Sequence, residues 1–134
     1  MIPEFDERGY LPPGIHQASL EEVIARFGVQ SEVRQAQAES LDWLVPLCKS
    51  AGIIRMLING SFVTDVLEPN DVDCVLLQWP TFDAESFDVE EIEDGLPFLE
   101  LELVDATDYR FYSERFFASD RNKIAKGLVE VILA

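Results

Sequence analysis

The most informative stretch of the chain is residues 60–74, which read Gly60-Ser61-Phe62-Val63-Thr64-Asp65-Val66-Leu67-Glu68-Pro69-Asn70-Asp71-Val72-Asp73-Cys74. A Gly-Ser turn stands nine residues ahead of an Asp-x-Asp pair in it. Short apolar runs flank the loop at residues 53–58 and 72–77. Runs of this length and composition are typical of buried strands. The stretch therefore predicts a polar loop between two buried strands.

The residue types in this loop suit a metal-and-phosphate site. Gly60 allows close approach of the backbone to a ligand, and Ser61 stands where a helix could begin with free N–H groups for an anion. Asp71 and Asp73 are two residues apart, so on a strand both side chains point to the same face. Carboxylates that converge repel each other unless they share a proton or bind a divalent cation such as magnesium. The alternative is a plain polar turn before a strand.

The same residues resemble a known family. Leu57-Ile58-Asn59-Gly60-Ser61 followed by Asp71-Val72-Asp73-Cys74 resembles the signature of the DNA polymerase beta-like nucleotidyltransferase superfamily, in particular its minimal nucleotidyltransferases. Residues 9–16, 26–28 and 126–131 look like a small branch of that superfamily, often found beside toxin–antitoxin genes. The resemblance implies a metal-dependent enzyme that transfers a nucleoside monophosphate from a nucleoside triphosphate to a hydroxyl acceptor. It specifies neither the acceptor nor the triphosphate.

The resemblance also implies two magnesium ions held by three carboxylates, of which Asp71 and Asp73 match the first two. The third comes from a later strand, expected at residues 98–105. Asp105 is preferred because it stands at the exit of that strand. Glu102, with an apolar neighbour on either side, is the alternative. Glu100 shares a face with Glu102, and a solvated strand face is the expectation for at least one of the two.

Phosphate contacts are expected from Gly60 and Ser61 and from the basic residues near the end of the chain. Five of the ten Lys and Arg residues follow position 109, and among them Lys123 and Lys126 are the candidates for nucleotide binding. Because a triphosphate needs cationic contacts, we place this role where the chain carries its positive charge. A solvated helix and turn surface is the alternative for each of these residues.

The charge of the chain limits its partners. With 26 acidic and 10 basic residues the net charge is −16, which repels a long nucleic acid. Residues 83–94 contain seven acidic residues and no basic one. Such a run is usually a solvated loop or helix face, but it also fits a basic partner such as a toxin. The alternative function is therefore a catalytically inactive nucleotidyltransferase-fold antitoxin or interaction protein, and a third is a regulator that senses a triphosphate without transferring it.

Length and hydropathy predict one domain over residues 1–134. The chain has 48% apolar residues, enough for a core. It shows no signal peptide and no apolar run of the roughly 18 residues that cross a membrane, so we expect a cytoplasmic protein without membrane contact. A domain this small leaves little room for a region that grips base and acceptor. A homodimer or a complex with a partner chain would complete the site.

The expected architecture is α/β, a nucleotidyltransferase-like mixed sheet of about four strands packed against helices. Strands are predicted near residues 53–59, 72–78, 98–105 and 128–133. Helices are predicted over 19–28, where Ser19 and Glu22 form a capping box, and over 31–50 and 108–118. Residues 1–18 are rich in proline and glycine and predict an extended arm. Trp43 is expected to pack in the core.

Overall fold

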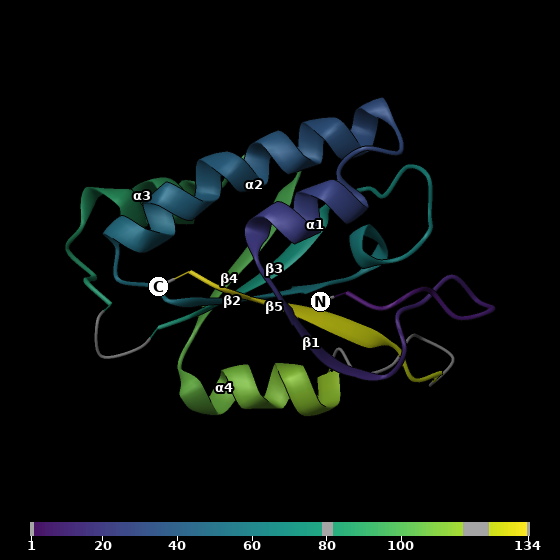
Figure 1. The fold of residues 1–134 in the computed structure, drawn as a ribbon. Coiled ribbons are helices and arrows are strands. Elements are labelled where there is room, and N and C mark those ends of the chain that lie inside the picture. Colours follow the sequence, from purple (N-terminus) through teal and green to yellow (C-terminus); the bar gives the residue numbers. More distant parts are fainter. Residues whose placement is uncertain (1, 79–81, 117–123, 134) are drawn as a thin grey trace.

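A five-stranded mixed sheet forms the centre of the protein in this computed structural model, which describes residues 2–78, 82–116 and 124–133 (Figure 1). The strands are β1 (Gly14–Ala18), β2 (Arg55–Asn59), β3 (Val72–Leu77), β4 (Leu99–Val104) and β5 (Gly127–Ile132), in the order β1-β5-β2-β3-β4. β2 runs antiparallel to both of its neighbours, whereas the outer pairs β1–β5 and β3–β4 are parallel. The predicted α/β class and mixed sheet are confirmed.

The expected number of about four strands misses β1, which lies inside the segment predicted to be an extended arm. β1 is an edge strand that pairs with β5, Gly14 standing opposite Gly127, and only Ala18 within it is buried. A strand so exposed shows no alternation of apolar and polar residues, which is the signal that reveals a strand in a sequence. Its partner also lies more than a hundred residues away along the chain.

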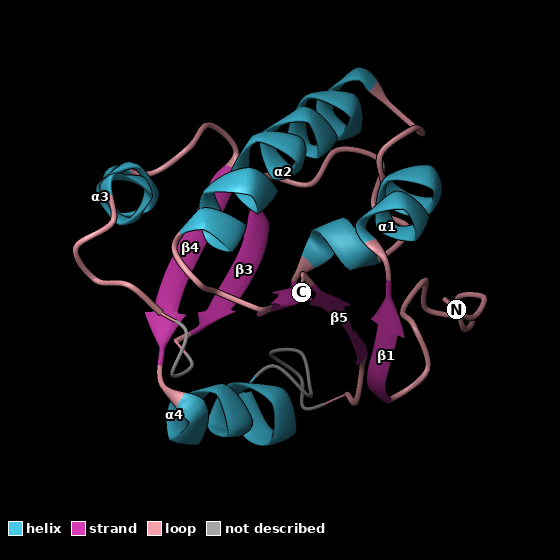
Figure 2. Ribbon diagram, turned by 60° about the vertical axis from the view of Figure 1, so that its left-hand side comes forward, coloured by secondary structure: helices cyan, strands magenta, loops and turns pink. Residues whose placement is uncertain are grey.

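Helices cover both faces of the sheet (Figure 2). α1 (Leu20–Phe27) and α2 (Glu32–Ser50) lie on one face, α3 (Phe87–Asp94) packs beside α2, and α4 (Ala106–Phe111) lies on the other face and continues as a π-helical turn through Phe116. The capping box is present, with the backbone N–H of Glu22 donating to Oγ of Ser19 at 3.1 Å. Within the described ranges, none of the helices has the length and apolar character that a membrane span requires.

The two faces of the sheet differ in polarity. Between the sheet and α1 and α2 lies the large apolar core, which includes Phe27, Leu41, Leu44, Met56, Ile58, Val72, Cys74, Leu76, Val129 and Val131. The cluster on the α4 face is smaller and consists of Leu57, Val75, Leu77, Val104, Tyr109 and Leu128. On β3 and β4 the same face also carries Asp73, Glu100 and Glu102. The α4 face is therefore part core and part polar surface.

The prediction that Trp43 packs in the core is wrong, because 64% of its surface is exposed. Leu41, Leu44 and Cys48 are buried and face the sheet from α2. Trp43 stands one residue before Leu44, a rotation of about 100° around the helix axis, which turns it away from the sheet. A large aromatic residue adjacent to a buried stripe does not by itself reveal on which side of the boundary it lies.

Candidate functional site

Gly60 brings the loop after β2 into contact with the Asp-x-Asp strand. Its φ of +81° lies in the left-handed region that favours glycine. A Cβ atom placed on Gly60 would lie 2.1 Å from Oδ2 of Asp73 and 3.2 Å from its Cγ. Only a residue without a side chain leaves room for the Asp73 carboxylate here. The structure thus brings the Gly-Ser and Asp-x-Asp elements of the sequence together at one place.

Three polar side chains form a row across the adjacent strands β2, β3 and β4. Asn59 pairs with Asp73 in the β2–β3 register, and Asp73 pairs with Glu100 in the β3–β4 register. Residues paired across neighbouring strands point to the same face, and the strands are about 4.8 Å apart. Asp71 lies two residues before Asp73, at the entrance to β3. Asp71 and Asp73 are half-buried and Glu100 is exposed, so the row is open to solvent on the β4 side.

The surroundings of Asp73 disfavour its charge. Burial is the largest cause, followed by the hydrogen bond and the charge of Glu100 and then by the charge of Asp71. Together they raise the pKa of Asp73 to about 6. Lys126, just before β5, acts in the opposite direction. Above pH 6 a cation that enters the cluster would reduce the repulsion between the ionised carboxylates. Below pH 6 a proton on Asp73 reduces this repulsion instead.

Asn59 adds a buried side-chain oxygen to the site, which was not among the residues predicted from the sequence. The residue is only 5% exposed, and its Oδ1 has no hydrogen-bond partner among the described residues. Leaving such a buried acceptor unsatisfied costs about 1–3 kcal/mol. A cation or a hydrogen-bond donor of a ligand beside Asp73 would satisfy it. The only signal in the sequence is that a polar residue ends the apolar run immediately before Gly60.

Arg34 of α2 fixes the backbone of the loop. It is 2% exposed and donates to the carbonyl groups of Phe27 at 2.9 Å, Phe62 at 2.7 Å, Thr64 at 2.7 Å and Val66 at 2.9 Å. A guanidinium group offers five donors in a rigid plane and is well suited to binding several carbonyl oxygens of one loop. No pattern in the sequence distinguishes Arg34, because an arginine on an amphipathic helix usually lies on its solvated side.

A second residue of α2 holds the other end of the same loop. Gln37 is fully buried, and its Nε2 donates to the carbonyl of Pro69 at 2.7 Å, two residues before Asp71. Arg34 and Gln37 are three residues apart and lie on the same face of the helix. The helix therefore holds both the turn after Gly60 and the approach to Asp71, which fixes the two halves of the candidate site relative to each other.

Of the residues expected to contact phosphate, Ser61 lies in a short turn after β2 and Lys126 lies just before β5. The helix predicted at Ser61 is a three-residue 3-10 turn, Ser61–Val63, whose first carbonyl accepts from Oγ1 of Thr64 at 2.7 Å. A turn this short has no long helix dipole to attract an anion. Lys126 is close enough to Asp73 to influence its ionisation. Lys123 lies outside the described residues.

The preferred third acid, Asp105, does not join the other two. It is the N-cap of α4, where its Oδ1 accepts from the backbone N–H of Asp108 at 2.8 Å. Since it stands five residues beyond Glu100, it is displaced along β4 by about 16 Å. Glu102 pairs with Val75 and accepts from the hydroxyl of Tyr112 at 2.9 Å. Glu100, one of the two acids of which at least one was expected on a solvated strand face, is exposed and is the acid beside Asp73.

The chemistry of these groups fits a hard cation. In the described part of the chain, no three His, Cys, Asp or Glu side chains are already arranged to hold a metal ion. Magnesium, however, commonly takes one or two carboxylates from a protein and completes its shell with water and substrate phosphate. Asp71 and Asp73 are two carboxylates of this kind, Asn59 Oδ1 is a further oxygen, and the exposed Glu100 stands opposite Asp73.

Comparison with curated proteins and with solved structures gave no match. A family is nevertheless shown for nearly the whole sequence, because residues 3–132 match a family of unknown function, DUF6932. That span includes every strand and helix of the structure and all of the candidate site residues. The chain therefore belongs to the DUF6932 family.

Proposed function

We propose that this protein is a metal-dependent nucleotidyltransferase with a nucleotidyltransferase-like fold, which transfers a nucleoside monophosphate from a nucleoside triphosphate to a hydroxyl acceptor. The observation that carries the proposal is the contact between Asp73 and Gly60, because it joins a close-approach turn to a pair of carboxylates. The position of the turn after β2 and of the acids at the start of β3 agrees with the family that the sequence resembles.

In this proposal Asp71 and Asp73 hold magnesium, and Glu100 replaces Asp105 as the third acid. The β3–β4 register supports Glu100, since it stands directly opposite Asp73. The unsatisfied Oδ1 of Asn59 supports a cation or ligand at the same place, because a protein rarely leaves a buried acceptor without a partner. The resemblance implies two ions, and the three carboxylates with Asn59 supply enough oxygen atoms for them.

The roles of the remaining residues follow from their positions. Magnesium bound by these carboxylates would neutralise the triphosphate and stabilise the attacking and leaving oxygens of an in-line displacement. Gly60 leaves the space that Asp73 needs, and Arg34 holds the turn in which the backbone N–H groups would contact phosphate. Lys126 adds positive charge near Asp73. Asp73 must be deprotonated to bind the metal, so metal affinity is expected to fall below pH 6.

One observation favours a second function, an inactive nucleotidyltransferase-fold protein that neutralises a basic partner such as a toxin. The exposed residues of α3 include Glu90, Glu91, Glu93 and Asp94, and no Lys or Arg occurs between residues 83 and 108. An acidic surface of this kind suits a cationic protein. This function requires neither a metal nor a nucleotide.

Thermal denaturation distinguishes the two functions. The four common ribonucleoside triphosphates are each added with and without magnesium to the native protein and to Asp71→Asn, Asp73→Asn and Asp105→Asn. A ligand at about 100 times its dissociation constant stabilises a protein by about 2.7 kcal/mol. We expect a magnesium-dependent shift in the native protein and in Asp105→Asn, where asparagine still caps α4, and none in the other two variants. The absence of a shift for every triphosphate, or an equal shift in Asp73→Asn, would reject the proposed enzyme.

A further inference from the structure

An apolar groove lies on the surface between α2 and the segment that leads into β4. It is lined by Ala36, Glu39, Ser40, Trp43, Pro97 and Phe98 and has a volume of about 160 Å³. Trp43 is 64% exposed and Phe98 is 46% exposed. Aromatic side chains gain much free energy when they leave water, so two that flank one hollow mark a position for an apolar group of a partner.

Phe98 adopts a backbone conformation that glycine would adopt more easily. Its φ is +66°, and among the described residues no other non-glycine residue has a positive φ. This conformation brings a Cβ atom close to a neighbouring carbonyl oxygen and is unfavourable for residues with side chains. A glycine at this position would relieve the strain and remove an exposed apolar side chain. The stability of the isolated chain therefore does not account for a phenylalanine here.

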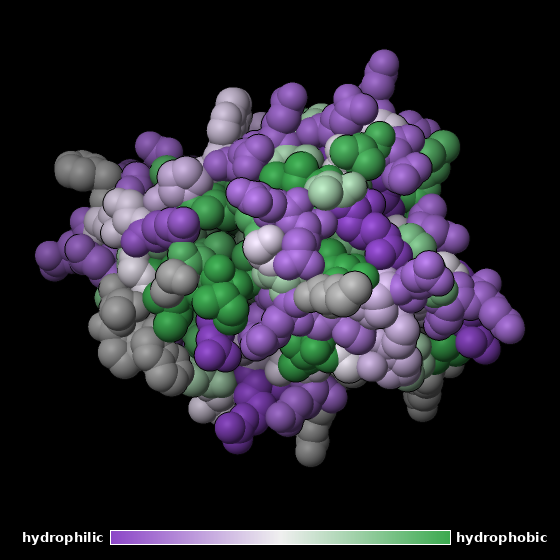
Figure 3. Space-filling view, viewed as in Figure 1, coloured by the Kyte–Doolittle hydropathy of each residue, from purple (hydrophilic) through white to green (hydrophobic). Residues whose placement is uncertain are grey.

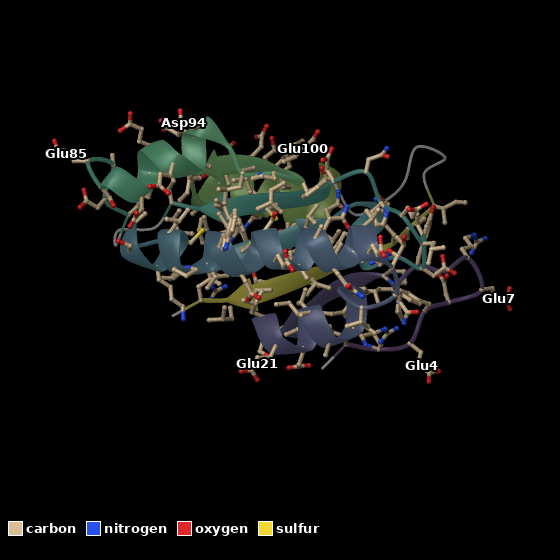
Figure 4. The ribbon with its side chains drawn as sticks, turned by 90° about the horizontal axis from the view of Figure 1, so that it is seen from above. Glu4, Glu7, Glu21, Glu85, Asp94 and Glu100 are labelled. Atoms are coloured by element: carbon tan, nitrogen blue, oxygen red, sulfur yellow. The ribbon has the colours of Figure 1, made fainter. Side chains whose placement is uncertain are left out.

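Acidic residues predominate in the segments of the chain that form the groove. Between residues 35 and 48 of α2 the charged residues are Glu39 and Asp42, and from Asp83 to Asp108 there are eleven acidic residues and no basic one. Figure 4 shows Glu85, Asp94 and Glu100 along one side of the molecule, while Glu4 and Glu7 lie on the opposite side. Figure 3 shows that hydrophilic and apolar residues are interspersed on the face seen in Figure 1. An apolar centre with an anionic rim is the complement of a cationic amphipathic segment.

We propose that the groove binds a cationic segment of a partner protein, which inserts one apolar side chain between Trp43 and Phe98. A Lys or Arg of the segment would stack on the exposed ring of Trp43, within reach of Glu39 one helical turn away. The negative charge of the chain disfavours a second copy of the chain and a nucleic acid as occupants of the groove. A second copy of this chain would bring a net charge of −16 against an equal charge, and nucleic acid is repelled in the same way.

The groove lies near the same end of β3 and β4 as the candidate site, on the α2 side of the sheet. The carbonyl of Phe98 accepts from the backbone N–H of Val72 at 2.8 Å, and Val72 stands between Asp71 and Asp73. A segment held at Phe98 is therefore brought to the same end of β3 and β4 as the carboxylates. None of the groove residues is assigned to metal or phosphate, so the docking proposal does not depend on the proposed transfer reaction.

Synthetic peptides of equal length test the proposal. One is an amphipathic helix of Lys and Leu, the second replaces Leu by Ser, and the third replaces Lys by Glu. Binding is followed by the fluorescence of Trp43 in a Trp79→Phe background, which leaves one tryptophan, and by calorimetry. We expect the Lys–Leu peptide to shift the Trp43 emission to the blue and to bind at least tenfold more tightly than the Lys–Ser peptide. The Glu–Leu peptide should not bind.

Variants separate the groove from general attraction between opposite charges. Trp43→Ala and Phe98→Gly should each weaken binding of the Lys–Leu peptide at least tenfold without weakening binding of the Lys–Ser peptide. The double variant Glu39→Gln/Asp42→Asn should weaken binding of the Lys–Leu peptide more than the double variant Glu4→Gln/Glu7→Gln. The second variant removes the same charge from the opposite side of the molecule. Equal effects of the two double variants, or unchanged binding by Trp43→Ala, would overturn the proposal. A native dimer in sedimentation that Trp43→Ala dissociates would also overturn it, in favour of a second copy. Asp73→Asn should bind the peptide within twofold of the native protein even if no triphosphate binds.

Discussion

Replacing Gly60 by alanine tests whether the close approach of Asp73 to the loop forms the site. The added Cβ would stand 2.1 Å from Oδ2 of Asp73, and ordinary contact begins at 3.4 Å, so the two atoms must separate by 1.3 Å (3.4 − 2.1). Alanine at a φ of +81° also carries backbone strain of about 1–2 kcal/mol. A displacement of about 1 Å at a functional group reduces activity by about 100-fold. The variant should therefore lose both stability and the site.

Gly95→Ala is the matched control. Gly95 has a φ of +90°, and a Cβ atom placed on it meets nothing within 4 Å. This variant has the strain of Gly60→Ala without the collision. In urea denaturation we expect both variants to lose about 1–2 kcal/mol of unfolding free energy. Only Gly60→Ala should also lose the magnesium-dependent stabilisation by nucleoside triphosphate.

A second measurement does not depend on any ligand. Carbon-13 NMR titration of the Asp carboxyl groups reports the pKa of Asp73, which is about 6 in the native protein because of burial and the neighbouring Glu100 and Asp71. Moving the carboxylate away from Gly60 exposes it to water, so its pKa should fall toward the ordinary value in Gly60→Ala and stay near 6 in Gly95→Ala. A Gly60→Ala protein that keeps both the pKa of Asp73 and the triphosphate response would refute the reasoning.

Variants of Asp73, Arg34 and Asp105 address single interactions. A raised pKa in the folded state means that Asp73 stabilises the fold at low pH and that this contribution is lost as the pH rises through 6. At about 1.36 kcal/mol per pKa unit the shift corresponds to about 3 kcal/mol, which solvent screening of this half-buried group reduces to about 1–2 kcal/mol. Asp73→Asn should therefore be more stable than the native protein by about 1–2 kcal/mol in urea at pH 8 and equally stable near pH 4. If the variant is less stable at pH 8, the raised pKa of Asp73 is contradicted. Arg34→Lys removes hydrogen-bond donors from the carbonyl groups of the loop, and each carbonyl left unsatisfied costs about 1–3 kcal/mol. In the same assay we expect the free energy of unfolding to fall by about 3 kcal/mol. A fall below about 1 kcal/mol would show that water replaces the guanidinium group. Asp105→Ala should cost about 1 kcal/mol through loss of the α4 cap, whereas Asp105→Asn should cost little; if either change abolishes the triphosphate response, Asp105 belongs to the site after all.

Local signals in the sequence were reliable where neighbouring residues determine the structure. The Ser19 and Glu22 capping box begins α1 as expected, and α2 ends at Ser50 at the predicted position. The apolar runs on either side of the loop became β2 and β3, which are adjacent and antiparallel. In each case a contact within a few residues, or burial of a continuous apolar run, decides the conformation. Such contacts are visible in the sequence because they do not depend on distant parts of the chain.

The identity of the third acid could not be predicted from local sequence patterns. Glu100, Glu102 and Asp105 occur within six residues of one another, and each is acidic and on or next to the same strand. Which of them faces Asp73 depends on how β4 is aligned along β3, and the parallel register sets Glu100 opposite Asp73. A shift of two residues would have placed Glu102 there with every side chain on the same face. Apolar alternation therefore cannot distinguish these two registers.

The sequence by itself determined the α/β class, the strand-loop-strand unit around residues 60–74 and the residue types that make it a candidate metal and phosphate site. These properties follow from composition, periodicity and turn chemistry, which act over short distances along the chain. The tertiary structure alone decided that β1 joins β5, that Arg34 and Gln37 hold the loop, that Glu100 rather than Asp105 lies beside Asp73, and that Trp43 is exposed. Each of these depends on strand register or on packing between segments far apart in sequence, for which no local pattern exists.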